Sequence, residues 1–267
     1  MADRGRDPAE RERHMNFKLT KHLAAATGAL ALGASAALAF DPAAMTDAER
    51  EAFRAEIRAY LLENPEVLAE AIDVLQTRQA EAEAKGDAAL VVANADDLFR
   101  DGYSYVGGNP DGAITVVEFI DYRCGYCRKA HAEVAALVSG DPDIRYVVKE
   151  FPILGDQSVI ASRFAIAALQ LFGPEAYAKI NAGFYETFRG DVTAETLTAF
   201  AGELGLDSAA IMARMDAPEV TRIIADNHLL AQRMKISGTP TFVLGGQMLR
   251  GYAPLAALQS IVEDERG

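Results

Sequence analysis

A pair of cysteines directly after an apolar run limits the possible folds of this chain more than any other motif. Cys124 and Cys127 are the only cysteines among its 267 residues, and they follow the run from Ile114 to Ile120. Such a run is typical of a buried strand. A strand that leads into a Cys-x-x-Cys pair at the first turn of a helix is how a thiol–disulfide exchange site is built. The motif therefore predicts α/β structure and redox chemistry at the two sulfur atoms.

The place of each cysteine on the helix predicts its role. Cys124 stands at the helix start, where unpaired amide groups and the helix dipole favour the thiolate. We therefore expect it to be the nucleophile, with a pKa of about 5 instead of about 8.5. Cys127 lies one turn deeper and can attack a mixed disulfide held on Cys124. A purely stabilising disulfide is the alternative, but so short a loop would restrict the unfolded chain very little.

The same cysteines also admit a metal hypothesis. Cys124, Cys127 and His131 could face one ion, with His228 as a distant fourth ligand. Structural zinc normally takes four ligands at recognisable spacing, and only three are local here. Copper(I) needs fewer soft ligands, so copper capture by the two cysteines is an alternative. Under the exchange hypothesis the chain needs no cofactor and no metal.

Residues 1–39 have the pattern of a secretory signal peptide. A basic stretch precedes an Ala/Gly/Leu run, and the run ends in residues 37–39, which have the small-x-small form of a cleavage site. Met15 opens this leader better than Met1 does, so the translation start could be Met15. We expect cleavage after residue 39. An uncleaved membrane anchor is the alternative, although the apolar stretch is shorter than the roughly 20 residues of a spanning helix.

Export and charge together restrict the compartment and the partners. Outside the cytosol a dithiol can rest as a disulfide, whereas the cytosol would keep it reduced. The chain has a net charge of −13, which disfavours nucleic acid and anionic membrane surfaces as partners. The sequence therefore predicts a periplasmic protein that binds no nucleic acid.

Residues 40–100 are predicted to form an N-terminal helical extension. Residues 46–49 have the spacing of a capping box, and two apolar stripes at helical spacing flank Asn64-Pro65, ahead of a polar stretch over 76–86. Two short helices with one apolar stripe each cannot bury those stripes alone. We therefore expect a homo-oligomer formed through residues 46–80, and packing against the chain's own domain is the alternative.

Residues 101–267 alternate strand and helix patterns. Strands over 114–120 and 144–151 flank a helix over 124–138, which predicts a parallel β-α-β unit. A helical insert then occupies about 156–235. A strand pair and a last helix end the chain.

Two segments carry a resemblance to a known family. With the residues from Glu118 to Cys127 and from Gly238 to Phe242, the chain resembles the DsbA-like thiol–disulfide oxidoreductases of the bacterial envelope. Within that family it is most similar to the suppressor-of-copper-sensitivity C-type (ScsC-like) disulfide isomerases. The resemblance implies a thioredoxin fold with a helical insertion, plus an N-terminal helical extension. It also implies a cis Thr239-Pro240 peptide facing Cys124, whose backbone can pair with an extended substrate; an ordinary trans proline is the alternative.

The resemblance also assigns roles to other residues near the dithiol. Glu118 matches an acid buried under the dithiol, where burial would raise its pKa and let it accept the proton of Cys127. A solvated strand glutamate is the alternative. The sequence between the cysteines lacks the histidine of strongly oxidising members, and threonine before the proline is more like the isomerases. Substrate contacts are expected from the residues of two loops: Gly125, Tyr126, Thr239 and Pro240.

These features together predict an exported enzyme that isomerises or reduces disulfides in cysteine-containing envelope proteins. Isomerisation requires Cys124 to rest as a thiolate, so a membrane redox partner that keeps the pair reduced is implied. A DsbA-type dithiol oxidase is the first alternative, and it would need an electron acceptor. Copper(I) binding by Cys124 and Cys127 is the second alternative.

Overall fold

The computed structural model describes residues 42–267. The predicted signal peptide, its cleavage site and the alternative start at Met15 lie outside the described residues. Within the described part, no helix is both long and apolar enough to cross a membrane. The chain divides after Glu63 into two compact units, and each is described by itself.

The first unit contains a short 3₁₀ turn, Pro42–Ala44, and helix α1, Asp47–Glu63. The predicted capping box is present at the start of α1. The amide of Thr46 donates to Glu49 Oε2 at 2.8 Å, and the amide of Glu49 donates to Thr46 Oγ1 at 3.3 Å. No residue of α1 is buried within the described structure.

The second unit begins with α2, Glu66–Ala93, and α3, Ala95–Phe99. The expectation that the second helix of the extension is short and lies ahead of the polar stretch over 76–86 is wrong, because α2 is continuous through that stretch. The stretch consists mainly of Ala, Glu, Gln, Lys and Arg, which are good helix formers. Their preference outweighs the cost of about 1 kcal/mol for Gly86 in a helix.

Five strands form one sheet in the order β1-β3-β2-β4-β5. β2 and β3 are parallel, as predicted, and the other neighbouring pairs are antiparallel. This arrangement joins the β-α-β half of a thioredoxin fold to its β-β-α half. The strands are β1 Tyr105–Gly108, β2 Ile114–Ile120, β3 Ile144–Glu150, β4 Thr241–Leu244 and β5 Gln247–Arg250.

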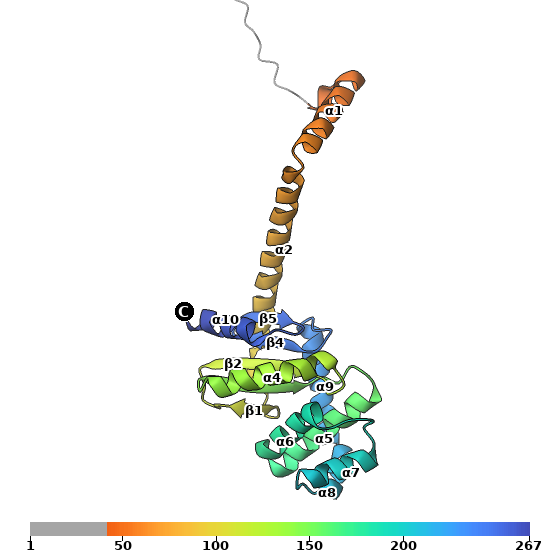
Figure 1. Ribbon diagram of the computed structural model, residues 1–267, viewed down its shortest axis with the longest axis vertical. Coiled ribbons are helices and arrows are strands. Elements are labelled where there is room, and N and C mark those ends of the chain that lie inside the picture. The colour runs from red at the N-terminus through yellow and green to blue at the C-terminus, as the bar shows by residue number, and fades with distance from the viewer. Residues whose placement is uncertain (1–41) are drawn as a thin grey trace, which may run out of the picture. The chain divides into compact units, whose positions relative to one another are not determined.

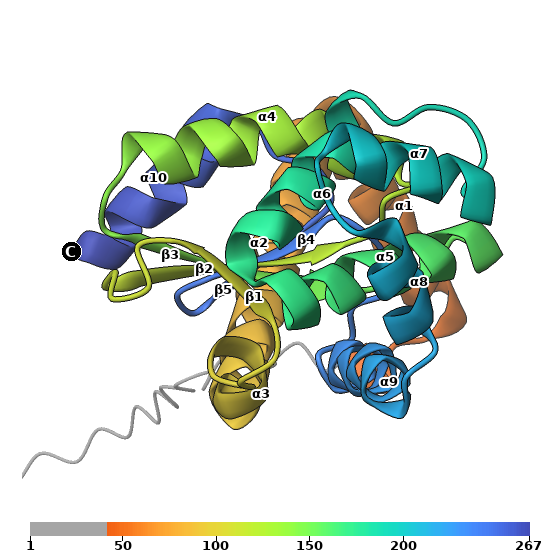
Figure 2. The ribbon, with the colours of Figure 1, turned by 90° about the horizontal axis from the view of Figure 1, so that it is seen from below.

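Successive residues of β2 face opposite helical layers. Val116 packs with residues of α4 and α10, whereas Val117 packs with residues of α3 and α9. Figure 2 shows α4 and α10 on one side of the sheet and α3 and α9 on the other. Glu118 follows Val116 by two residues and therefore faces the α4 side. The bounds of these helices are α4 Gly125–Gly140, α9 Pro218–Arg233 and α10 Leu255–Arg266.

A helical insertion separates β3 from β4, as the thioredoxin-fold prediction requires. Its first four helices gather into one cluster beside the sheet, which both ribbon views show (Figures 1 and 2). Phe164 and Phe184 of this cluster belong to the same buried apolar core as Cys124 and Cys127. The insertion therefore forms one wall of the dithiol site. The four helices are α5 Asp156–Phe172, α6 Pro174–Glu186, α7 Ala194–Glu203 and α8 Ser208–Met215.

Candidate active site

The loop between β2 and α4 holds Cys124 at the start of the helix. The Cys124 backbone is extended, with φ −76° and ψ 117°, and its amide donates to the carbonyl oxygen of Asp121 at 3.0 Å. The Asp121 carboxylate accepts hydrogen bonds from the amides of Arg123, Ile153 and Leu154 at 2.7, 2.8 and 3.0 Å. Asp121, which the sequence analysis did not single out, thus joins the loop after β2 to the loop after β3. It fixes the backbone that presents the nucleophile.

Cys124 is the more accessible of the two cysteines. It is 8 % exposed, compared with 1 % for Cys127, and both are free thiols. Cys124 Sγ lies 3.2 Å from the carbonyl oxygen of Thr239, and the Thr239–Pro240 peptide is cis. The structure therefore brings together two motifs that are 115 residues apart in the sequence.

The surroundings of Cys124 favour its thiolate. A hydrogen bond with the Cys127 thiol is the largest influence, and the amides of Cys127 and Tyr126 add to it. Together they lower the pKa of Cys124 to about 5, although burial acts in the opposite direction. The value matches the sequence-based expectation, but the main cause is different. The partner thiol contributes more than either helix amide does.

The surroundings of Cys127 favour its thiol. Burial is the main cause that raises the pKa of Cys127 far above its usual range, and the hydrogen bond with Cys124 and the charge of Glu118 add to it. One sulfur is therefore an anion at rest, and the other must lose a proton before it can attack. This inequality suits a site where Cys124 captures a partner and Cys127 releases it.

Glu118 lies in the interior beside the dithiol. It is 3 % exposed, so it is not a solvated strand residue. Burial raises the pKa of Glu118 to about 7, and a hydrogen bond that the Tyr146 hydroxyl donates to its Oε2 limits that rise. A carboxyl group with a pKa near neutrality can take up and release a proton at physiological pH.

The other predicted contact residues form the surface around Cys124. Tyr126 is 65 % exposed, and Gly125 has open space where a Cβ would stand. Pro240 is buried, and its carbonyl oxygen accepts a hydrogen bond from the amide of Gly251 at 2.8 Å, which ties the proline loop to the end of β5. The second residue after the nucleophile thus presents an exposed aromatic ring, and the Thr239 carbonyl oxygen lies 3.2 Å from Cys124 Sγ.

Glu150 is a second buried carboxyl group near the site, and its role was not apparent from the sequence. Its carboxylate accepts hydrogen bonds from the hydroxyls of Tyr122, Tyr177 and Ser162 at 2.7, 2.6 and 2.7 Å. Burial raises the pKa of Glu150 to about 7, against the effect of these donors. Tyr122 also belongs to the apolar core that contains both cysteines. The network therefore stiffens the wall of the dithiol site.

The two histidines that the metal hypothesis used are engaged elsewhere. His131 Nε2 lies 3.2 Å from Glu186 Oε1, and the His131 ring lies 5.2 Å from the ring of Tyr185. The ring of His228 packs on Phe151 at 4.9 Å. Within residues 42–267, no three His, Cys, Asp or Glu side chains are grouped so that they could hold a metal ion. The hypothesis of a metal site completed by His131 and His228 is therefore wrong.

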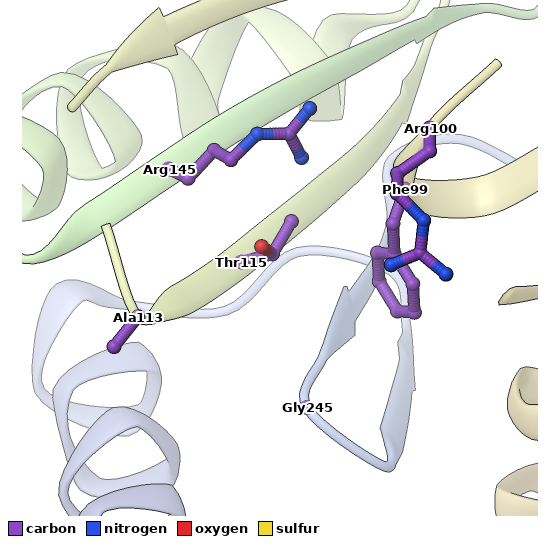
Figure 3. Close-up of a pocket in the computed structure, with 6 residues that line it drawn as sticks. All are labelled: Phe99, Arg100, Ala113, Thr115, Arg145 and Gly245. Carbon is purple, nitrogen blue, oxygen red and sulfur yellow. The ribbon is translucent and has the colours of Figure 1, made fainter. Parts of the chain in front are cut away.

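A cavity of about 420 Å³ lies at the opposite end of β2 from the dithiol, where Figure 3 shows the Arg145 side chain extending from β3 over the sheet. Arg145 and Thr115 are paired in the parallel register and face away from α4. Arg100, also on the cavity wall, is paired with Asp96 at 2.8 Å. This cavity is separate from the redox site. Its walls are formed by Phe99, Arg100, Ala113, Thr115, Arg145 and Gly245.

Comparisons with known proteins agree with this geometry. The model of the DSBA-like thioredoxin domain matches residues 115–263, and the model of the copper resistance protein ScsC N-terminal domain matches residues 49–82. A curated relative, the Na(+)/H(+) antiporter NhaA of Herminiimonas arsenicoxydans, is 30 % identical over 165 residues, which are 61 % of this chain and 25 % of that protein. The chain thus spans about a quarter of the length of the curated relatives it matches.

Two solved structures are similar over most of their own length. A thioredoxin-like oxidoreductase from Silicibacter pomeroyi is 42 % identical, with a TM-score of 0.60 over 64 % of this chain and 96 % of that one. BcfH of Salmonella enterica Typhimurium is 26 % identical, with a TM-score of 0.68 over 82 % of this chain and 97 % of that one. The domain match covers more than half of the chain and includes both cysteines and the cis proline. The chain therefore belongs to the DSBA-like thioredoxin domain family.

Proposed function

We propose that this protein is exported and exchanges disulfides in cysteine-containing envelope proteins through Cys124 and Cys127. The observation that carries the proposal is the contrast between the two sulfurs beside the Thr239 carbonyl. Cys124 has a pKa of about 5, whereas burial keeps Cys127 protonated. Cys124 attacks a substrate disulfide, and Cys127 then displaces the substrate from the mixed disulfide. Thr239 and Pro240 align the substrate backbone, and Gly125 and Tyr126 contact its side chains.

We propose isomerisation or reduction as the direction of exchange. A pKa of about 5 makes the reduced form more stable at pH 7 by about 3 kcal/mol, which is roughly 60 mV for two electrons. This stabilisation makes the disulfide form more oxidising and keeps the resting dithiol reduced, so it favours isomerisation over reduction. A stable thiolate can start the reshuffling of a wrong disulfide, provided that a membrane redox partner keeps the pair reduced. The Gly-Tyr dipeptide between the cysteines and Thr239 before the proline support this direction.

Refolding of a scrambled protein with several disulfides tests the proposal. The reduced enzyme should restore the native pairing, and Cys124→Ser should abolish the effect because no other thiolate can start exchange. Cys127→Ser is the matched variant: it should accumulate a mixed disulfide with the substrate. Normal rescue by Cys124→Ser would contradict the proposal.

Two alternative functions predict different results. A dithiol oxidase would oxidise substrate thiols rapidly in its disulfide form and would not rescue the scrambled protein. A copper(I)-binding protein would bind Cu(I) tightly, and Cys124→Ser would abolish this binding. Such a protein would not catalyse the reduction of insulin disulfides.

We also propose that residues 46–80 form a homo-oligomer. Support comes from the first half of α2, where Leu68, Ile72 and Leu75 are 50 %, 53 % and 55 % exposed. Stable helices normally bury such a stripe. Ile72→Lys with Leu75→Lys should lower the mass in solution to that of one chain, whereas Glu70→Lys on the same helix should leave it unchanged. A single-chain mass for the unmodified protein would contradict self-association.

A further inference from the structure

Tyr146 connects the buried Glu118 carboxyl with a cavity. Its hydroxyl donates a hydrogen bond to Glu118 Oε2, and its side chain lines a cavity of about 310 Å³ between β1, α4 and α6. Glu118 is 3 % exposed, whereas Tyr146 is only half-buried. Tyr146 lies opposite Val116 in the parallel register, so its hydroxyl reaches along the same face of the sheet toward the dithiol.

We propose that Tyr146 is a positioning residue that holds Glu118 toward Cys127 and relays the proton of that thiol to solvent in the cavity. The inference rests on the proposed role of Glu118 as the proton acceptor. It adds a route by which the proton leaves a carboxyl group that has almost no exposure of its own.

The proposed step starts from a mixed disulfide on Cys124. A substrate sulfur is bonded to Cys124 Sγ, and Cys127 gives its proton to the Glu118 carboxylate. The Cys127 thiolate then attacks Cys124 Sγ, the Cys124–Cys127 bond forms, and the bond to the substrate breaks. The electron pair of that bond leaves on the substrate sulfur, so the substrate disulfide is reduced and the enzyme dithiol is oxidised. Glu118 passes its proton to the Tyr146 oxygen as the Tyr146 hydroxyl gives its own proton to solvent.

Of the groups around Glu118, Tyr146 is the one that links the Glu118 carboxyl group to the cavity. Cys124, the N-cap residue of α4, and Cys127 of α4 interact electrostatically with Glu118, and Tyr185 of α6 is a further titratable neighbour. On the β4 side the residue opposite Glu118 is apolar Phe242. Among the described residues that line the cavity, Tyr146 is the one that donates to Glu118.

Tyr146→Phe and Tyr105→Phe form a matched pair of variants. Tyr105 lines the same cavity, and its ring stacks on Tyr177 at 4.5 Å, so each substitution removes one hydroxyl from one cavity wall. The measured quantity is the rate at which Cys127 displaces a chromogenic aromatic thiol from a mixed disulfide on Cys124, followed by stopped flow from pH 5.5 to 9. This rate should rise with pH as Glu118 ionises.

Tyr146→Phe removes a hydrogen bond that stabilises the Glu118 carboxylate, so the midpoint of the pH profile should move up by about one unit. The rate at pH 7 should fall about fivefold, since the ionised fraction falls from about one half to about one tenth. Tyr105→Phe should leave the midpoint in place. The thiolate titration of Cys124 should be the same in both variants.

Glu118→Gln separates this inference from the proposed function. If Glu118→Gln leaves the pH profile unchanged, the role of Glu118 itself is wrong. If Glu118→Gln removes the pH dependence but Tyr146→Phe behaves like Tyr105→Phe, Glu118 is the acceptor and the Tyr146 inference is overturned. In the Glu118→Gln background, the rate should stay independent of pH when Tyr146→Phe is added.

A cavity-filling variant tests the route without altering Tyr146. Ala178 lines the cavity from α6 and is half-buried, so Ala178→Leu should exclude solvent from the cavity. The displacement rate should fall severalfold while its pH midpoint stays in place. An unchanged rate in Ala178→Leu, with the chain folded by circular dichroism, would show that the proton leaves by another path.

Discussion

Glu118 and Glu150 are buried carboxyl groups on two neighbouring strands, and their surroundings differ. Each is 3 % exposed, and burial raises the pKa of each to about 7. Glu150 accepts hydroxyl hydrogen bonds from Tyr122, Tyr177 and Ser162. In the described structure, Glu118 accepts a hydroxyl hydrogen bond from Tyr146. The other titratable neighbours of Glu118 are Cys124, Cys127 and Tyr185.

This difference shows that a perturbed pKa does not by itself identify a functional carboxyl group. The donors around Glu150 come from the loop after β2 and from two helices of the insertion, so its network holds separate elements together. A satisfied buried network of this kind stabilises one arrangement of the chain. Glu118 instead faces a thiol that must lose a proton during exchange. We therefore assign a structural role to Glu150 and a chemical role to Glu118.

The largest expected effect comes from removing each carboxyl group in turn. Glu150→Ala leaves three buried hydroxyl donors without an acceptor and should lower the free energy of unfolding by about 3 kcal/mol at pH 4, where both carboxyl groups are neutral in the folded chain. Glu118→Ala leaves one such donor and should cost about 1 kcal/mol or less at this pH. Because neither folded carboxyl group is charged at pH 4, the difference between the two variants measures the loss of the hydroxyl donors. Denaturant unfolding measures both free energies. Equal losses of stability in the two variants would contradict the structural role of Glu150.

The pH dependence of stability should be the next largest effect. The pKa of Glu118 is raised from 4.5 to about 7 on folding, so its contribution to stability is fully present below pH 4.5 and is lost as the pH rises through 7. Glu118→Gln cannot ionise and should exceed the unmodified chain in stability by about 3 kcal/mol at pH 8.5, with the difference vanishing near pH 4.

Glu150→Gln is the control for this measurement. The glutamine amide replaces one of the two acceptor oxygens with an NH2 donor, which then faces either the Ser162 hydroxyl or the hydroxyls of Tyr122 and Tyr177, so the variant should gain less stability at pH 8.5 than Glu118→Gln does. Unfolding titrations at several pH values test the contrast. A larger gain for Glu150→Gln would reverse the assignment of the two roles.

Tyr177→Phe should have the smallest effect of this series. It removes one of the three hydroxyl donors of Glu150 and should cost about 1 kcal/mol of stability at pH 7. The rate at which iodoacetamide alkylates Cys124 should not change, because the Cys124 thiolate depends on Cys127 and on the amides of the first turn. A marked change in alkylation would mean that the Glu150 region also acts on the nucleophile.

Local patterns were sufficient to predict the dithiol and its strand. The apolar run at 114–120, the cysteines at a helix start and the capping box at 46–49 each depend on residues close together in sequence, and the structure has all three. The position of Thr239 beside Cys124 came from the family resemblance. No periodicity could have placed two segments 115 residues apart within 3.2 Å.

The side-chain partners could not be predicted, because they depend on register and on the insertion. Tyr146 reaches Glu118 only because β2 and β3 align Val116 with Tyr146. Tyr177, which donates to Glu150, lies 27 residues away on α6. The expected end of the second helix before residues 76–86 was wrong for another reason. A polar stretch that contains a glycine looks like a linker unless the helix propensities of all its residues are added together.

The most direct test of the account is a titration of thiolate absorbance in the reduced protein from pH 3 to 10. We expect a midpoint of about 5 that disappears in Cys124→Ser. In Cys127→Ala the midpoint should move up, because that variant removes the largest influence on the Cys124 thiolate. A midpoint above 8 in the unmodified protein, or one that persists in Cys124→Ser, would contradict the claim that Cys124 is the activated nucleophile.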